Sequence, residues 1–339
     1  MTSRRQVLVL IVNYRCAALT LRALESLKHE RLDPNLDLKV LVVENASGDE
    51  AILRQGIESQ YGDFAHLVVS PVNGGFGAGN NLGLKTGHAM GLVPDYVHML
   101  NPDTEVKPGA VSTLVRFMDA HPRAAISSGS FEFQDGKEWP FAFRFPSIAS
   151  ELETGFRWRP VSRVLGNHAI VRTMGNEPER VDWCSGASMM VRREVLESVG
   201  GFDERFFLYF EEVDLCLRIR DAGWEIWYVP ESRVMHISGQ STGVTAPDAG
   251  PRRLPAYWFE SRRRYFVKHH GALYAGLADA AALVGHSFGV LKDKIKRVAP
   301  TPHMVRDLAA QSVLWPSNRK LMQAEHYVLP KSTPPPANN

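Results

Sequence analysis

The sequence predicts an α/β fold with a mainly parallel central sheet, helices on both of its faces and a helical C-terminal extension. Two observations carry this prediction. In the first half of the chain, short apolar runs alternate with stretches of helical periodicity, and runs such as VLVLIV contain no polar residue. A strand that is apolar on both faces belongs to a sheet covered on both sides, and β–α alternation is typical of parallel connections.

Five strands and four helices are expected in this first half. The strands occupy residues 7–12, 38–43, 66–70, 96–100 and 124–128. Helical patterns lie near residues 17–28, 50–60, 78–90 and 108–120. The last pattern has Pro108 in its first turn and stops before Pro122, where proline ends a helix.

Polar residues follow several of these strand ends. They are Asn13, Glu44, Asn73 and Asp103. Because the carboxyl ends of parallel strands lie at one edge of a sheet, we expect these residues to surround one crevice.

The second half of the chain is less regular. Residues 129–180 lose the period and are rich in aromatic residues and arginine, which predicts an insertion or lid over the crevice. Residues 181–236 predict a strand, a helix ending at Gly200 and Gly201, a helix near 211–222 stopped by Gly223, and two short strands. The predicted main domain is 1–240, with a helical basic extension at 241–330 and a disordered tail at 331–339.

Charge is distributed unevenly although the net charge is only +2. From residue 251 to the end there are 14 Lys or Arg and 5 Asp or Glu, against 25 and 32 in the rest of the chain. The basic quarter indicates either a solvated helical face or an anionic partner such as a membrane surface. Residues 272–291 are the candidate membrane span, but Asp279 and His286 interrupt them, so an interfacial helix is preferred.

The three cysteines are Cys16, Cys184 and Cys216. Their odd number and wide spacing fit neither a metal pattern nor a disulfide framework, which predicts a reducing compartment. The apolar run at residues 7–12 is too short for a signal peptide. The expected location is cytoplasmic, with peripheral attachment to the inner face of the cell membrane left open.

The stretch YVHMLNPDTEV ends an apolar strand on Asn101, Pro102 and Asp103. Proline cannot continue a ladder and favours an extended residue before it, so the amide and the carboxylate are held at a sharp strand end. One interpretation is that Asp103 or Thr104 caps the helix after Pro108. The other is a metal or phosphate site, and both stay open at this point.

The stretch NGGFGAGNNLG, residues 73–83, is the most glycine-dense part of the chain. It does not match G-x-G-x-x-G and does not follow the first strand, which disfavours a dehydrogenase. Its glycines would let a ligand approach the backbone, and the following helix offers its N-terminus to negative charge. A glycine-rich turn without a ligand is the alternative.

Three acids open the helix near residue 211: Glu211, Glu212 and Asp214. Acids there favour the helix dipole, and Asp214 can pair with Arg218 one turn later. A carboxylate among like charges and aromatic residues can instead have the raised pKa of a general base. His236 ends a strand and becomes a credible metal ligand only if the fold brings it next to Asp103.

Taken together, these stretches resemble glycosyltransferase family 2, and within it the bacterial rhamnosyltransferase-like enzymes. The matching pieces occur in the family's order over residues 6–240: VLIVNYR, VVENASGD, NGGFGAGNNLG, LNPDTEV, WCSGASMMVRREVLESVGGFDERFFLYFEEVDLCLR and VMHISG. The resemblance implies a GT-A fold and an inverting transfer of a sugar, with rhamnose favoured, from a nucleoside-diphosphate sugar to a saccharide hydroxyl in cell-surface polysaccharide synthesis.

The resemblance also implies roles for single positions. Glu212 matches the catalytic base and Glu211 its acidic neighbour, while Asp103 and His236 match metal ligands. The nucleotide-sugar positions are Asn13, Tyr14, Glu44, Asn73, Gly75, Phe76, Asn80 and Asn101. The acceptor positions are Trp183, Ser185 and Gly186. Two departures from the family pattern are Glu44, where Asp is usual, and Asn101, which replaces the first acid of the metal motif and would contact the ribose or a metal-bound water.

The implied cofactor is a divalent cation, Mg²⁺ or Mn²⁺, which neutralises a diphosphate leaving group. The expected donor is dTDP- or UDP-linked, and the basic C-terminal quarter is consistent with a polyprenyl-diphosphate-linked acceptor. No nucleic-acid partner is expected. A nucleotidyltransferase and a catalytically silent scaffold remain as alternatives.

Overall fold

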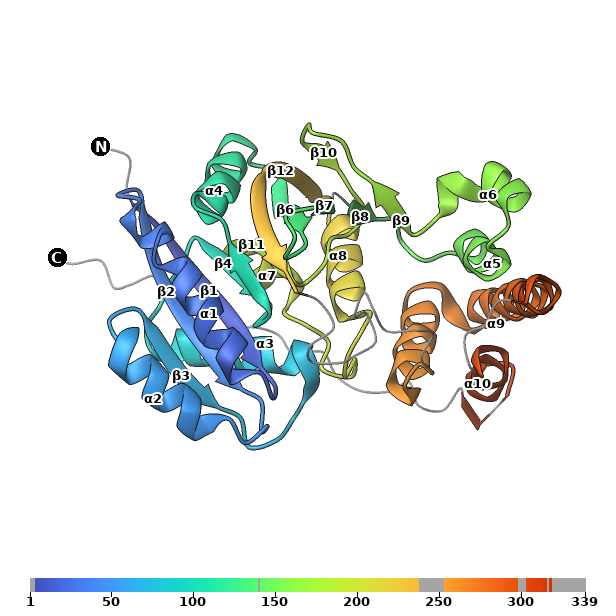
Figure 1. Ribbon diagram of the computed structural model, residues 1–339, viewed down its shortest axis with the longest axis horizontal. Coiled ribbons are helices and arrows are strands. Elements are labelled where there is room, and N and C mark those ends of the chain that lie inside the picture. Colours follow the sequence, from blue (N-terminus) through green and yellow to red (C-terminus); the bar gives the residue numbers. More distant parts are fainter. Residues whose placement is uncertain (1–3, 140, 238–252, 298–302, 316, 319–339) are drawn as a thin grey trace.

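The computed structural model describes residues 4–139, 141–237, 253–297, 303–315 and 317–318. A central sheet has the strand order β10-β12-β6-β11-β4-β1-β2-β3 (Figure 1). The bounds of these strands, in chain order, are β1 (Arg5–Asn13), β2 (Leu36–Glu44), β3 (Ala65–Val69), β4 (Tyr96–Leu100), β6 (Ala124–Glu132), β10 (Glu179–Arg180), β11 (Ser188–Arg192) and β12 (Glu225–His236).

The sheet is mainly parallel, as predicted. Strands β1 to β4 run parallel to one another, and β12 runs parallel to β6, while β11 is antiparallel to both β4 and β6. Two short strands extend it: β5 (Thr104–Val106) pairs with β12, and β7 (Glu138–Trp139) pairs with β6. A separate ribbon joins β8 (Phe141–Phe143) to β9 (Val171–Thr173).

Helices cover both faces of the sheet, which confirms the prediction (Figure 1). The apolar residues of α1 (Ala17–Leu27), α2 (Glu50–Gln60) and α4 (Ala110–Ala120) pack on the face that carries Val9 and Ile11. Those of α3 (Gly75–Ala89), α7 (Arg193–Val199) and α8 (Glu211–Asp221) pack on the opposite face, which carries Leu8 and Leu10. The alternation along β1 gives each face its own core.

The bounds of β4 and α2 agree with the prediction, but α3 begins at Gly75, three residues earlier than expected. Glycines explain how this helix packs. A Cβ at Gly79 would come within 2.7 Å of the Val12 side chain, and Gly83 meets Leu10 in the same way. The glycine-dense stretch therefore brings α3 close to β1.

The capping interpretation of the turn after β4 is wrong. Helix α4 begins at Ala110, with Gly109 at its N-cap in a left-handed conformation (φ 83°), so Pro108 lies before the helix. Glu30, in the short 3-10 helix η1 (Glu30–Leu32), accepts hydrogen bonds from the backbone N–H groups of Gly109 (2.6 Å) and Ser112 (3.1 Å). The cap comes from a distant segment, and Thr104 begins β5 instead.

Residues 225–236 form one strand, β12, rather than the two short strands expected. The register shifts between Val229 and Arg233, around Pro230, where proline cannot donate to the ladder. Strand β6 also continues to Glu132, four residues into the predicted insertion.

The helical part of that insertion lies beside the C-terminal helices, whereas its strands β7 and β10 join the central sheet and β8 and β9 form the separate ribbon. It contains α5 (Ile148–Phe156), α6 (Arg159–Leu165) and the short helix η2 (Gly166–His168). Helix α5 packs on α9 (Ala256–Lys296) (Figure 1). Gly155 lies against the backbone of Gly285. Helix α9 bends at Gly271 (φ 80°, ψ 168°), and we call its halves α9a (256–270) and α9b (272–296).

Helix α10 (Met304–Gln311) packs on α9. The predicted disordered tail, 331–339, lies outside the described residues.

Candidate active site

The turn after β4 holds Asp103 beside His236. The hydroxyl of Thr104 donates to the carbonyl of Asn101 (2.6 Å), and Asn101 N–H donates to the carbonyl of Ala187 (2.9 Å). The buried carboxylate Oδ1 of Asp103 lies 3.3 Å from Nε2 of His236, the last residue of β12. The two side chains implied as metal ligands are thus adjacent in space.

This pair of ligands is compatible with a divalent cation. A carboxylate oxygen and an imidazole nitrogen are ligands for Mn²⁺, and Mg²⁺ commonly uses one or two carboxylates together with substrate phosphates. Within the described ranges, no cluster of three or more His, Cys, Asp or Glu is arranged to hold a metal ion. A cation held by Asp103 and His236 would therefore depend on oxygens from a diphosphate or from water.

The second part of the site is the start of α8. The two residues before it, Tyr209 (φ 69°) and Phe210 (φ 68°), have left-handed backbone, which costs on the order of 1–2 kcal/mol each for residues with a Cβ. This turn rests on the backbone of Gly75, where a Cβ would lie 1.7 Å from the carbonyl oxygen of Phe207. The beginnings of α3 and α8 are therefore packed together, which places Glu211 beside Gly77.

Each of the two glutamates of this turn has one buried carboxylate oxygen without a partner among the described residues. Glu211 is 2% exposed, and Glu212 keeps some exposed surface, but the Oε2 atom of each is buried with no hydrogen-bond partner in the described part of the chain. Burial raises the pKa of both side chains, and the charge of Glu212 adds to the effect on Glu211. The pKa of Glu212 rises to about 7, which is in the working range of a general base.

The third acid of the turn, Asp214, is fully paired. Arg218 Nε lies 2.9 Å from Oδ2 and His269 Nε2 lies 2.7 Å from Oδ1, which Lys268 also contacts. Burial alone would raise the pKa of Asp214, but the hydrogen bond from His269 and the charges of Arg218 and Lys268 hold it well below its usual range. The predicted pair of Asp214 and Arg218 is confirmed.

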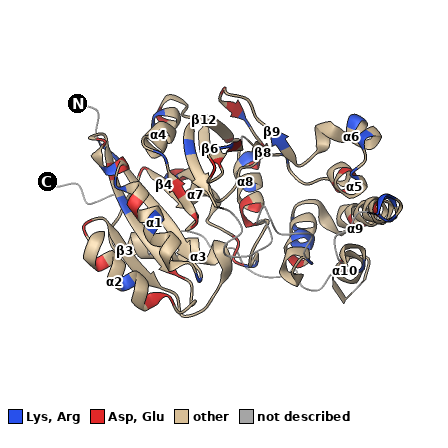
Figure 2. Ribbon diagram, viewed as in Figure 1, with Lys and Arg blue, Asp and Glu red and all other residues tan. Residues whose placement is uncertain are grey.

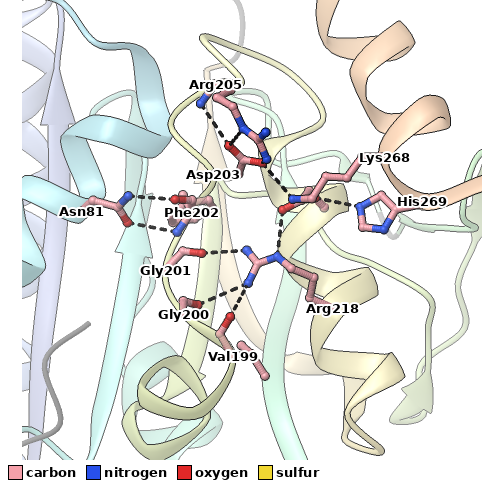
Figure 3. A network of polar contacts seen from close by, with 11 residues as sticks. Asn81, Val199, Gly200, Gly201, Phe202, Asp203, Arg205, Arg218, Lys268 and His269 are labelled. Carbon is pink, nitrogen blue, oxygen red and sulfur yellow. Dashed lines mark hydrogen bonds and ion pairs between the residues drawn. The ribbon is translucent and has the colours of Figure 1, made fainter. Parts of the chain in front are cut away.

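The same cations tie α8 to α9a and to the loop before α8. Lys268 also contacts Asp203 (2.8 Å), and Arg218 donates to the carbonyls of Val199 (2.7 Å) and Gly201 (2.6 Å) (Figure 3). We call this set the α8–α9a network; its side chains are those of Asp203, Asp214, Arg218, Lys268 and His269. It fixes the helix that carries Glu211 and Glu212.

The resemblance implies that Asn13 and Glu44 contact the nucleotide. In the structure, both side chains form hydrogen bonds to other residues of the protein. The Asn13 amide donates to Asp49 Oδ2 (3.0 Å) and its oxygen accepts from the Thr20 hydroxyl (2.8 Å). Glu44 Oε1 accepts from the backbone N–H of Ser47 (2.6 Å). Both side chains are buried, so they shape the edge of the sheet through internal hydrogen bonds.

Asn45 was missed by sequence reasoning and holds the glycine loop. Its amide donates to Asn73 Oδ1 (3.0 Å) and to the carbonyl of Gly75 (3.2 Å). Asn73 Oδ1 also accepts from the backbone N–H of Gly75 (3.0 Å). The signal was available, because Asn45 directly follows Glu44 at a strand end.

The remaining nucleotide-sugar positions keep unused polar groups or exposed surface. Asn80 donates to the carbonyl of Phe76 (3.0 Å), but its buried Oδ1 has no partner among the residues described. Tyr14 is half-buried, with the guanidinium of Arg15 lying 5.2 Å from its ring centre.

Residues 183–187, which contain the implied acceptor positions, bridge the two parts of the site. Trp183 stacks on Phe143 (3.9 Å between ring centres) and donates from Nε1 to the carbonyl of Arg144 (2.9 Å). A Cβ at Gly186 would lie 3.0 Å from the ring of Phe76. The Ser185 hydroxyl accepts from the N–H of Ala187 (3.2 Å).

The same segment contacts both α8 and the turn after β4. Cys184 contacts Cys216, one turn after Glu212 on α8. Ala187 accepts from Asn101, as described above. The structure brings Asp103 and His236 into direct contact, and residues 183–187 contact both the turn that carries Asp103 and the helix that carries Glu212.

Two cavities lie away from these residues. One of about 40 Å³ lies between Leu8, Leu84 and Val97, and one of about 130 Å³ lies beside Tyr228 and Arg233 at the irregular part of β12. Neither is lined by a residue of the candidate site.

Comparison with known proteins places this geometry in context. A family model described as "Glycosyltransferase like family 2" matches residues 4–249. An N-acetylglucosaminyl-diphospho-decaprenol L-rhamnosyltransferase of Mycobacterium tuberculosis is 32% identical over 252 residues, covering 71% of this chain and 75% of that protein. The dTDP-rhamnosyl transferase RfbF of Shigella flexneri is 23% identical over 240 residues, covering 68% and 74%.

Solved structures share the fold. GalNAc-T7 with UDP, GalNAc and Mn²⁺ has a TM-score of 0.56 at 15% identity, covering 90% of this chain and 57% of that one. The mannosyltransferase PcManGT of Pyrobaculum calidifontis, in complex with GDP-Man and Mn²⁺, has a TM-score of 0.53 at 16% identity, covering 93% and 88%. The fold is of the GT-A type, as predicted.

Proposed function

The chain belongs to glycosyltransferase-like family 2, and from that premise we propose that it is an inverting enzyme that transfers rhamnose from a nucleoside-diphosphate sugar to a saccharide hydroxyl in polysaccharide synthesis. Support for rhamnose comes from the names of the relatives in Mycobacterium tuberculosis and Shigella flexneri. We propose a dTDP- or UDP-linked donor, because the Shigella relative is named for dTDP and GalNAc-T7 was solved with UDP.

The proposed acceptor is a saccharide on a polyprenyl diphosphate. The Mycobacterium tuberculosis relative is named for a diphospho-decaprenol acceptor. Such an acceptor is anchored in lipid, so we propose that the protein works in the cytoplasm at the inner face of the cell membrane.

The observation that carries the proposal is the pair of glutamates at the start of α8. Glu211 and Glu212 are enclosed, lack partners for Oε2 in the described chain, and have raised pKa values because of burial. An unpaired buried carboxylate is costly, and it is useful where a substrate hydroxyl completes its hydrogen bonding.

The proposed chemistry is a single displacement. Glu212 accepts the proton of the acceptor hydroxyl while the hydroxyl oxygen forms a bond to the anomeric carbon. The bond from that carbon to the diphosphate oxygen breaks on the opposite face, so the configuration inverts. A well-placed general base contributes ~10²–10⁴-fold in rate. Glu211 is the acidic neighbour of this base, and the charge of Glu212 adds to burial in raising the pKa of Glu211.

Asp103 and His236 would hold the Mg²⁺ or Mn²⁺. When bound, the cation neutralises charge on the diphosphate as a Lewis acid. The residues proposed around the nucleotide sugar are Asn13, Tyr14, Glu44, Asn73, Gly75, Phe76, Asn80 and Asn101. Those proposed on the acceptor side are Trp183, Ser185 and Gly186.

The test is a transfer assay with dTDP-rhamnose, UDP-sugars and GDP-mannose, each with Mn²⁺ or Mg²⁺ and a synthetic lipid-linked saccharide. We expect acceptor-dependent release of the nucleoside diphosphate, loss of release with a chelator, and an inverted anomeric centre by NMR. In a parallel assay with a nucleoside triphosphate and a sugar 1-phosphate, release of pyrophosphate would indicate a nucleotidyltransferase. Absence of turnover with every donor would favour a silent scaffold, and retained configuration would disprove the single displacement.

A further inference from the structure

One side of α9b is apolar and uncovered. Its buried side is made of small residues such as Ala275, Ala278 and Ala282, which lie in apolar clusters with residues of α8, α9a and α10. At 100° per residue, five large apolar residues fall on the opposite side. We call them the apolar row; they are Leu273 (82% exposed), Leu277 (52%), Val284 (58%), Leu291 (57%) and Ile295 (76%).

The row is unusual for a protein surface. Single exposed leucines are ordinary, but a contiguous apolar strip indicates an interaction surface. The row extends for about 33 Å along the helix, from Leu273 to Ile295. A helix that is apolar on all sides is normally covered on all sides. The residues of the apolar row instead keep 52% to 82% of their surface exposed.

Charge around the row is of one sign. Both acids of α9b are buried and paired, Asp279 with Arg262 and Asp293 with Arg157. The exposed charges at its end are all basic: Lys294, Lys296 and Arg297. Figure 2 shows this basic end and the basic residues of the neighbouring helix α6, whose Arg159 and Arg163 are exposed.

We propose that the apolar row lies in the surface of an anionic lipid bilayer, with Lys294, Lys296 and Arg297 at the lipid phosphates. The proposal rests on the proposed function, since a polyprenyl-linked acceptor lies at such a surface. The basic residues favour an anionic lipid surface, and they disfavour a parallel pairing with a second copy of the chain, which would bring like charges together. Helix α9 is long and apolar enough to span a membrane by length and composition, but α5 covers one side and Asp279 is buried there, so the helix lies along the bilayer.

The attachment would also position the active site. Lys268 and His269 of α9a hold α8 through Asp214. A bilayer that binds α9b therefore keeps Glu212 at a set height above the lipid head groups.

The test compares the full chain with the variant L273E/L277E in co-sedimentation with vesicles. The vesicles are phosphatidylcholine with about one third phosphatidylglycerol, against phosphatidylcholine alone. We expect the wild type to bind the anionic vesicles and L273E/L277E to bind at least about tenfold more weakly, because two leucines leave the acyl region. K294Q/K296Q/R297Q should weaken binding to anionic vesicles only, by about fivefold per charge.

A matched control uses equally exposed apolar residues on the sheet domain, Leu32 (79% exposed) and Ile52 (57%). L32E/I52E should bind vesicles like the wild type. L273E/L277E should keep the wild-type unfolding midpoint and transfer to a water-soluble saccharide, and lose transfer to an acceptor embedded in vesicles. Failure of all variants to transfer to the soluble saccharide would count against the proposed function while leaving the vesicle result valid.

Three results would overturn the proposal. One is equal vesicle binding by wild type and L273E/L277E. Another is a lipid-free dimer that L273E/L277E converts to monomer, which would assign the row to a second copy. The third is vesicle binding that appears only after residues 319–339 are deleted, which would assign the row to that segment of the chain.

Discussion

Two groups of carboxylates lie within one turn of α8 and have opposite surroundings. Glu211 and Asp214 are equally inaccessible, at 2% and 0% exposure, so burial does not separate them. Asp214 is contacted by Arg218, Lys268 and His269, whereas Oε2 of Glu211 and of Glu212 has no partner within the described chain. The neighbouring cations lower the pKa of Asp214, whereas burial without such neighbours raises the pKa of Glu211 and Glu212.

The difference separates a structural acid from a candidate catalytic one. A buried carboxylate with several cations stabilises the fold and gains nothing from a substrate. A buried carboxylate without a partner destabilises the fold, and a bound hydroxyl can relieve that cost. Perturbed pKa values of the second kind cluster at functional sites.

The largest expected effect is on catalysis at Glu212. Glu212→Gln keeps the shape of the side chain but removes the base, so we expect the transfer rate to fall by ~10²–10⁴-fold. Initial rates at saturating donor measure this, with calorimetric binding of the donor as the control that should not change. A rate within a few-fold of wild type would show that the unpaired group is not the base.

The next effect is on stability at Asp214. Asp214→Asn leaves Lys268 and His269 facing a neutral amide in a buried site, so we expect the free energy of unfolding to fall by about 3 kcal/mol. Urea unfolding at neutral pH measures the loss. Adding Lys268→Met should recover part of it, because the unpaired charge is removed as well. An unchanged midpoint in Asp214→Asn would contradict the assigned role of the network.

The contributions of Glu212 and of the network acids to stability should depend on pH in opposite directions. The transfer rate should fall about tenfold per pH unit below about 7, where Glu212 becomes protonated. Glu212 has a folded-state pKa above its ordinary 4.5, so its contribution to stability is present below about 4.5 and is lost as pH rises through about 7.

Asp203 provides the contrast within the network. Burial opposes ionisation, but Arg205 and Lys268 lower its pKa to about 2, so its contribution is present above about 3.8 and is lost as pH falls through about 2. Rate profiles and unfolding curves across this range check both signs. Glu212→Gln should reduce the stability change near pH 7, leaving the part that Glu211 contributes, and should leave the acid change intact.

The smallest effect is expected for an exposed ion pair. Arg54 lies 2.7 Å from Glu50 on α2, and both side chains are 49% exposed. Solvent and salt screen such a pair, so Arg54→Ala should leave the unfolding midpoint unchanged within error. If Arg54→Ala lowered the free energy of unfolding as much as Asp214→Asn, burial would not explain why the α8–α9a network contributes more to stability than a surface ion pair.

Much of the sheet could be predicted because its signals are local. The run at residues 96–100 and the helix at 50–60 were found with their observed bounds, since an apolar run and a helical period end at clear breaks. The Asp214–Arg218 pair followed from helix spacing. The family resemblance added the order of the motifs, and the family match agrees with it.

Contacts between distant segments could not be predicted. The cap of α4 comes from Glu30, and the role of Gly83 depends on Leu10. The basic residues of the C-terminal quarter were expected to lie on the surface, yet Arg262 and Arg263 are buried. Sequence alone gives the number of cations but not which of them find carboxylates inside the fold.

The bend at Gly271 has a consequence for how the chain tolerates change. Gly271 is exposed and would have no atom within 4 Å of a Cβ, so by its contacts it should accept any residue. Its φ of 80° and ψ of 168° lie in a region open almost only to glycine, where a side chain costs on the order of 1–3 kcal/mol. In a saturation mutagenesis map, this position should therefore stand out as intolerant beside permissive neighbours such as Ala272.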